Sequence, residues 1–201
     1  MLKILSVTLL LCTVQIGLSQ IDNSNKLQFG FSMGANYSHL KVVSPNNDYQ
    51  SINNLGSSLG ILSQLNMGSR LSLVGMASLS FNNGYITEAN LTQYQVTEYL
   101  SKTLDFGLNL RFKLKPDANF SPYLTVGPTY QINLDKNDLS NVFLPSNNLS
   151  LDLGFGLDKK LAFFNIAPEL KYSLGLINVN QNPTITSARA HYLKLIINFT
   201  N

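Results

Sequence analysis

Apolar and polar residues alternate with a period of two through most of this chain, and this pattern constrains the fold more than any other feature of the sequence. Such alternation is typical of β-strands that have one apolar and one polar face. From Leu27 to Ser38, every odd-numbered residue is apolar and every even-numbered residue is polar or glycine. Eight runs of this kind are present, at residues 27–38, 58–67, 71–81, 104–114, 124–134, 149–158, 164–174 and 192–199.

The segments that connect these runs alternate between long and short. This layout is typical of an up-and-down antiparallel barrel, with long loops at one end and tight turns at the other. No linker divides the chain into separate domains. The long connections are residues 41–56, 82–96, 135–147 and 178–187, and the short ones are residues 68–70, 115–121 and 158–160.

The apolar faces of the runs carry too many large side chains to be the interior of such a barrel. Eight strands enclose a space only just wide enough for side chains to fill. The opposite faces are rich in Gly, Ser, Thr and Asn, which suit a crowded interior. Charged residues make up only 12% of the chain, against about 25% in typical soluble domains, so we expect the apolar faces to contact lipid. The predicted fold class is an all-β, eight-stranded, up-and-down antiparallel transmembrane β-barrel.

The N-terminus has the features of an export signal. Lys3 precedes an apolar stretch, and Gly17 and Ser19 are small residues at the positions that signal cleavage requires. We expect residues 1–19 to be a cleaved signal peptide and residues 20–201 to form the outer-membrane β-barrel domain, which places the protein in the cell outer membrane. Cys12, the only cysteine, lies within the predicted signal, so the mature chain would have no disulfide.

A set of charges with balanced sign falls on the inward-facing positions of the runs. Charges in a confined interior must be paired or hydrated, so we expect a lumen polar network of ion pairs and hydrogen bonds that plugs the barrel. A narrow conducting pathway lined by the same groups is the alternative. The residues of this predicted network are Asp105, Arg111, Asp152, Glu169, Lys171 and Lys194.

No catalytic motif stands out in the sequence. There is no phosphate-binding Gly loop, no His-Glu-x-x-His and no Gly-x-Ser-x-Gly. His39 ends the first run and His191 precedes the last, so closure of the barrel would bring them together at the long-loop end. A metal site or a catalytic base there is the alternative to two exposed histidines without function. Because no Ser or carboxylate has a fixed spacing to either histidine, we predict no catalytic residue, no metal, no cofactor and no enzymatic activity.

Two details of the predicted strands carry further expectations. Pro128 and Pro168 each remove a hydrogen-bond donor from a strand that has two neighbours, so we expect β-bulges there. The last run ends with apolar residues in alternation, which looks like the signal that outer-membrane assembly machinery recognises. These residues are Leu193, Leu195, Ile197 and Phe199.

Several segments also resemble a known family. The segments YLSKTLDFGLNLRFKL at residues 99–114, SPYLTVGPTYQINL at 121–134 and PELKYSLGLINV at 168–179 occur in the order typical of the Bacteroidota PorT-like outer-membrane β-barrel family. The Gly-rich opening strand at residues 29–40 is similar to that family's first strand. The resemblance implies an eight-stranded barrel in the outer membrane of a Gram-negative bacterium of that phylum. Its founding member is associated with type IX secretion. Lys171 departs from the Arg expected in the third segment.

The sequence therefore favours a small integral outer-membrane β-barrel protein with a structural or interaction role through its long extracellular loops. We expect its partners to be the lipid bilayer, the assembly machinery and a protein of unknown identity, with a link to a secretion or envelope complex. The net charge of +3 is too small to indicate nucleic acid. A narrow pore is the main alternative, and an outer-membrane lipid- or peptide-modifying enzyme is a third hypothesis.

Overall fold

The computed structural model describes residues 27–43, 49–52, 54–82, 84–88, 96–99, 102–116, 118–134, 147–179 and 187–201. These residues form strands and turns, and none of their segments is a helix long and apolar enough to cross a membrane. The predicted signal peptide, residues 1–19, lies outside the described residues. The barrel strands are β1 (Leu27–Val43), β3 (Asn54–Asn66), β4 (Leu71–Phe81), β7 (Lys102–Lys113), β8 (Phe120–Asn133), β9 (Asn148–Lys160), β10 (Asn165–Gly175) and β11 (Ser187–Thr200).

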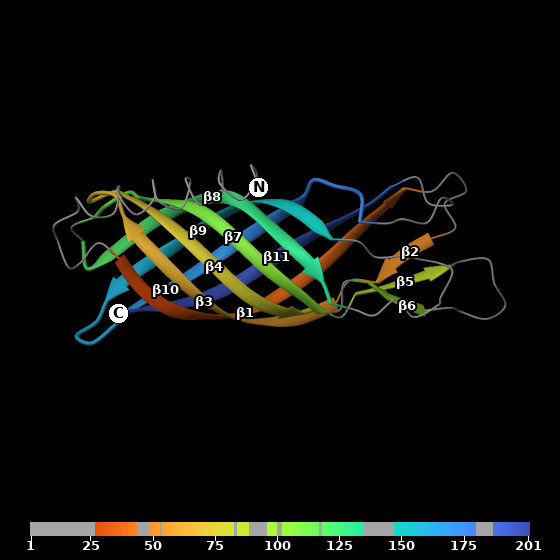
Figure 1. Cartoon of the computed structure of the whole chain (residues 1–201), viewed down its shortest axis with the longest axis horizontal. Helices are drawn as coiled ribbons and strands as arrows, with labels where there is room; N and C mark the ends of the chain where they lie inside the picture. The colour runs from red at the N-terminus through yellow and green to blue at the C-terminus, as the bar shows by residue number, and fades with distance from the viewer. Residues whose placement is uncertain are drawn as a thin grey trace, which may run out of the picture.

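The eight strands form one closed antiparallel barrel, as the sequence predicted. Their order is β1-β11-β10-β9-β8-β7-β4-β3, and β3 pairs with β1 to complete the ring. The strands follow one another around the wall in chain order, apart from the seam where the last strand meets the first (Figure 1). At this seam Met33 lies opposite Ile197. Each barrel strand has 11 to 17 residues, which is enough for a tilted strand to cross a bilayer.

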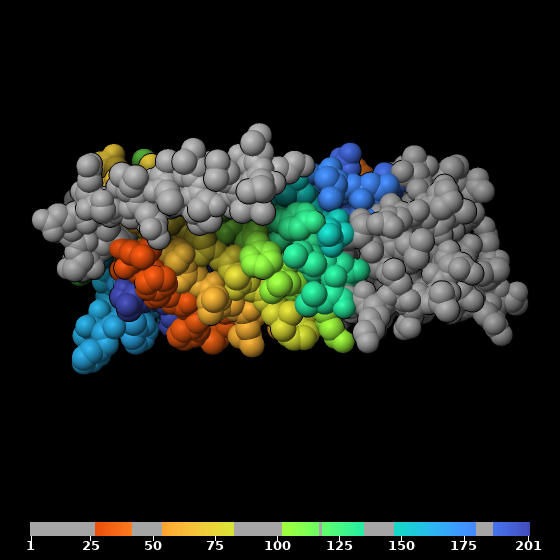
Figure 2. Space-filling view, viewed as in Figure 1, coloured from red at the N-terminus to blue at the C-terminus, as the bar shows by residue number. Residues whose placement is uncertain are grey.

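The side chains are distributed in the opposite way to those of a soluble protein. Large apolar residues of every barrel strand are exposed on the outside, for example Leu108 at 52% and Leu195 at 55%. Polar residues such as Asn36 and Gln131 are fully buried inside. Figure 2 shows the outer surface of the described strands as a wall of closely packed side chains. The prediction that the apolar faces are outside is therefore confirmed.

The long connections contain strands that the sequence analysis did not predict. β2 (Tyr49–Ile52), β5 (Gly84–Glu88) and β6 (Val96–Tyr99) form a separate three-stranded antiparallel sheet in the order β2-β5-β6. This sheet lies beyond the long-loop end of the barrel, at the right of Figure 1. Residues 41–56 were expected to be one long connection, but β1 continues to Val43 and β3 already begins at Asn54.

The bulges predicted at Pro128 and Pro168 are not formed. β7 and β8 pair up to Gly107 and again from Leu110 in an unchanged register, so no extra residue is inserted beside Pro128. The pairing between β9 and β10 is interrupted beside Pro168 in the same way. On the other neighbouring strand, each proline keeps a paired residue. Each proline lacks its N–H toward one neighbour only, so a short gap in one ladder replaces the bulge.

Arginine on the lipid-facing side should destabilise the barrel according to its depth. Leu108 lies in the middle of β7, and we expect Leu108→Arg to lower the free energy of unfolding by about 2–4 kcal/mol. Leu71→Arg at the first residue of β4 is the control, and its cost should be about 0–1 kcal/mol near the interface. Urea unfolding in phospholipid vesicles, followed by heat-modifiable gel mobility, measures both. Equal costs would contradict the membrane placement.

Candidate functional site in the barrel lumen

The six residues of the predicted network all lie in the lumen and are buried. Asp105 and Arg111 are on β7, Asp152 is on β9, and Lys194 is on β11. β10 contributes the remaining two members, Glu169 and Lys171. None of the six is more than 4% exposed. The period-two geometry of the strands places them inside, because each has the phase of the Ser, Asn and Gly residues.

Asp105 is the centre of one group of contacts. Its Oδ2 accepts hydrogen bonds from Lys194 Nζ at 3.1 Å and Ser80 Oγ at 2.9 Å. Its Oδ1 accepts hydrogen bonds from Thr103 Oγ1 at 2.7 Å and Gln131 Nε2 at 3.1 Å. Both carboxylate oxygens are thus satisfied by donors from β4, β7, β8 and β11, which explains how this fully buried charge is tolerated.

Glu169 is the centre of a second group. Arg111 Nη2 lies 3.3 Å from its Oε2, which also accepts hydrogen bonds from Tyr123 Oη at 2.9 Å and Asn198 Nδ2 at 3.4 Å. Lys171 Nζ lies 3.2 Å from the other oxygen, Oε1. A single carboxylate therefore joins two cations and two neutral donors from the strands around the lumen.

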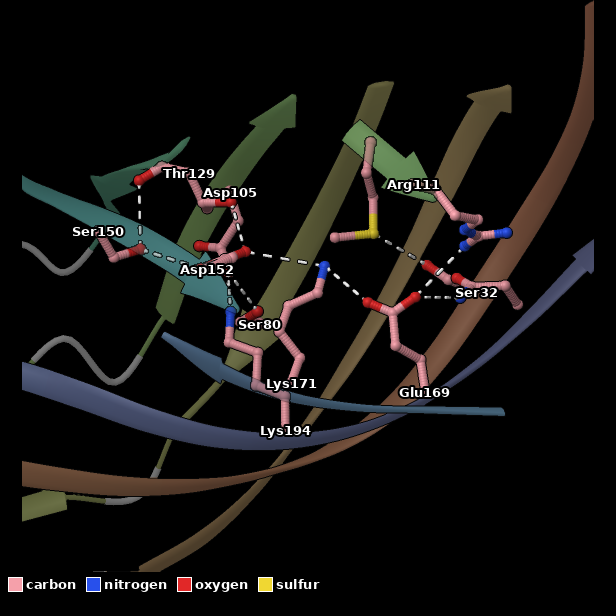
Figure 3. A network of polar contacts seen from close by, with 12 residues as sticks. Ser32, Ser80, Asp105, Arg111, Thr129, Ser150, Asp152, Glu169, Lys171 and Lys194 are labelled. Atoms are coloured by element: carbon pink, nitrogen blue, oxygen red, sulfur yellow. Dashed lines mark hydrogen bonds and ion pairs between the residues drawn. The ribbon is translucent and has the colours of Figure 1, made fainter. Parts of the chain in front are cut away.

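Lys171 connects Glu169 to a third carboxylate. Its Nζ also lies 3.7 Å from Asp152 Oδ2, and that oxygen accepts a hydrogen bond from Thr129 Oγ1 at 2.8 Å. The chain of contacts from Arg111 through Glu169 and Lys171 to Asp152 runs along the lumen (Figure 3). Together with the ion pair of Asp105 and Lys194, the network contains three acidic and three basic groups.

Tyr123 belongs to the network, although the sequence analysis did not select it. The Arg111 guanidinium lies over its ring, 4.1 Å from the centroid, and the side chain is fully buried. Gly156 is its cross-strand partner, and a Cβ there would lie only 2.3 Å from Tyr123 Cζ. The glycine leaves the space that the ring occupies. The sequence could have indicated this position, because Tyr123 has the inward phase of β8 and directly precedes the run at residues 124–134.

The lumen opens at the short-turn end into a polar cavity of about 500 Å³. Gln28, Asn66 and Asn201 are among the residues that line it. Lys113 and Asp158 also line the cavity and form an ion pair at its wall. Beyond the cavity, each of the six network residues is at most 4% exposed.

The two histidines have the outward phase of β1 and β11 at the long-loop end of the barrel. His39 is exposed, but His191 is only 9% exposed, so the expectation of two exposed histidines is wrong for His191. His39 and His191 are cross-strand partners, and their ring centroids are 6.4 Å apart. His191 Nδ1 accepts a hydrogen bond from the Gly175 N–H at 3.3 Å, and the imidazole stacks on Tyr172 with centroids 6.2 Å apart. Within the described ranges, no group of three or more His, Cys, Asp or Glu residues is arranged to hold a metal ion.

Comparison with known proteins agrees with this architecture. Residues 18–181 match the family described as outer membrane protein beta-barrel domain. No curated protein matches the chain.

Several solved structures share the fold at low sequence identity. The chain is similar to the outer membrane protein OprG from Pseudomonas aeruginosa, with 14% identity and a TM-score of 0.55 over 87% of this chain and 94% of that one. The outer membrane protein AlkL in lipid bilayers gives 13% identity and a TM-score of 0.50 over 90% and 94% of the two chains. The attachment invasion locus protein Ail of Yersinia pestis gives 12% identity and a TM-score of 0.46 over 88% and 99%. The similarity to OprG and AlkL shows a shared fold alone.

Removing the shared carboxylate of the network should be costly. Glu169→Gln leaves the Arg111 guanidinium buried without its ion-pair partner, so we expect the free energy of unfolding to fall by about 3–5 kcal/mol. Asp158→Asn is the matched control: its partner Lys113 lines the polar cavity, where water can reach the ammonium group, so its cost should be smaller than that of Glu169→Gln. Urea unfolding in vesicles gives both values. A Glu169→Gln variant as stable as the control would refute a structural role for the network.

Proposed function

This chain belongs to the outer membrane protein β-barrel domain family, and we propose that it is a structural and interaction protein of the outer membrane, which contacts its partners through its long-loop end. The observation that carries this proposal is the contrast between the two parts of the molecule. The lumen is filled by buried ion pairs, whereas the long connections form additional structure outside the barrel.

The separate sheet supports an interaction role. Its strands come from connections that are far apart in the chain, since β2 follows β1 whereas β5 and β6 follow β4. Tyr49 of β2 lies opposite Glu88 of β5, and Gly84 of β5 lies opposite Tyr99 of β6. Long external loops of a barrel are exposed to the outside of the cell. Ordered structure there provides a fixed surface for a partner. A connection that only joined two barrel strands would not need such structure.

We also propose the features that the sequence analysis predicted. Residues 1–19 would be removed on export, and residues 20–201 would form the mature barrel domain. The apolar residues that end β11 would be read by the outer-membrane assembly machinery. The PorT-like resemblance favours an origin in the Bacteroidota and a link to a secretion or envelope complex.

A narrow pore is the second candidate function, and one observation favours it. The polar cavity at the short-turn end leads toward the charged lumen, so movement of the network would create a hydrated path.

For the enzyme hypothesis, the relevant geometry is that of His191. Its Nδ1 is already occupied by the Gly175 N–H, which argues against that nitrogen as a catalytic base. We propose no enzymatic activity.

The interaction role is tested by removing part of the external structure. A variant in which residues 83–100 are replaced by a short Gly-Ser turn should fold but lose a partner that cross-links to the unmodified protein in native outer membranes. Mass spectrometry of the cross-linked products identifies the partner. Arg70→Gln, at the opposite end of the barrel, is the control and should keep it. A partner that survives the loop replacement would contradict the proposed surface.

Because the lumen is filled by paired charges, we expect the barrel not to conduct ions. In planar-bilayer recordings, the unmodified barrel should show no stable unitary conductance, because its lumen charges are paired and buried. The pore hypothesis predicts the opposite: a stable conductance that changes in Arg111→Ala or Glu169→Ala. Such a result would replace the interaction role with the pore.

A further inference from the structure

Carboxylates are confined to the inner side of the barrel wall, whereas basic groups occur on both sides. In the described residues of the eight barrel strands, all carboxylates have the inward phase: Asp105, Asp152, Asp158 and Glu169. The ionisable side chains with the outward phase in these strands are, apart from tyrosine, all basic or histidine: His39, Lys41, Lys102, Lys159, Arg189 and His191. An outer surface with this distribution attracts anions.

Four of the six outward groups lie together. His39 is the cross-strand partner of His191, and Lys41 is the cross-strand partner of Arg189, on the adjacent strands β1 and β11. Successive outward residues of a strand are about 7 Å apart, and paired residues about 5 Å apart. These four side chains, which we call the basic patch, therefore occupy an area about the size of one lipid headgroup. Lys41 and Arg189 are both exposed.

Aromatic residues fix the level of the basic patch in the membrane. One outward step below the histidines, Leu193 has Tyr37 as its partner on β1 and Tyr172 as its partner on β10. Both tyrosines face outward and are 42–43% exposed. Aromatic residues in transmembrane barrels mark the boundary between hydrocarbon and headgroups. The basic patch thus lies at the headgroup level of the leaflet on the long-loop side, directly above the apolar wall.

The chemistry of the basic patch suits a phosphate group. Lysine and arginine offer hydrogen-bond donors and no acceptors. His191 is only 9% exposed and its Nδ1 accepts the Gly175 N–H, so the exposed cations of the patch are Lys41 and Arg189. Arginine and lysine form strong charge-assisted hydrogen bonds with phosphate oxygens. A ligand with phosphate at one end and acyl chains at the other would contact both the basic patch and the apolar wall below it.

We propose that the basic patch of His39, Lys41, Arg189 and His191 binds the phosphorylated headgroup of a lipid in the outer leaflet. This site is independent of the lumen network and of the external sheet. Binding there would hold a lipid across the seam between β1 and β11, where the two ends of the chain close the barrel.

Native mass spectrometry of the refolded full chain in detergent tests this site. The probe is bisphosphorylated lipid A, and the unmodified protein should retain one molecule of it. The variant Lys41→Gln/Arg189→Gln should bind about 10- to 30-fold more weakly, because two cations near an anionic headgroup are lost. Lys102→Gln/Lys159→Gln is the matched control. It removes the same charge from the outer surface at scattered positions, and its affinity should stay within about twofold of the unmodified protein.

Two further measurements on the unmodified protein do not depend on whether the variants fold. Dephosphorylated lipid A should bind at least about tenfold more weakly than the bisphosphorylated form. Inorganic phosphate at the concentration of the lipid should fail to displace it, which separates a lipid site from a simple anion site. Equal losses in the two double variants, equal binding of the dephosphorylated lipid, or displacement by inorganic phosphate would each overturn the proposal. These measurements do not depend on conductance or on partner capture, so the lipid site and the proposed function are tested separately.

Discussion

Backbone pairing between the first and last barrel strands is the interaction on which the rest of this structure depends. Hydrocarbon offers no hydrogen-bond partners, so each unpaired N–H or C=O at that depth costs several kcal/mol. β1 pairs with β11 from Gly30 opposite Thr200 to Val43 opposite Ser187, and no edge is left within the ring. Closure encloses the lumen and brings residues from opposite ends of the chain together. Both the polar network and the basic patch exist only because this seam is formed.

Closure also explains why the interior is polar and tightly paired. A ring of eight strands encloses too little space for large side chains from every strand, so the inward positions carry Ser, Thr, Asn, Gly and a few charged residues. Tyr123 is accommodated because Gly156 has no Cβ. Once enclosed, the charges must satisfy one another. Glu169 does this by accepting contacts from Arg111 and Lys171, which makes the lumen a polar core of fixed composition.

Much of the barrel was predictable from alternation alone, because the period of a strand decides which face each side chain occupies. The inward phase of Asp105 and Lys194 follows from it, the outward placement of the apolar faces also needs the count of large side chains, and the order of the strands follows from the alternating lengths of the connections. The bulges at the prolines were a wrong prediction: a missing N–H affects one neighbouring strand, and the wall tolerates a short gap without a change of register. The sheet of β2, β5 and β6 could not be predicted either, since its short strands join connections that are distant in the chain.

The sequence by itself determined the class of the fold and the side of the wall on which each strand residue lies, because both are local consequences of a two-residue period. Only the tertiary structure decided which charges meet. Arg111 and Glu169 are 58 residues apart, and Asp105 and Lys194 are 89 residues apart; the register of the intervening strands sets their contacts. The same holds for the basic patch, where Lys41 and Arg189 become neighbours through closure. The two-residue period decides whether a side chain of one strand points inward or outward. Register and closure decide which side chains of different strands are neighbours, and no local sequence pattern contains the register.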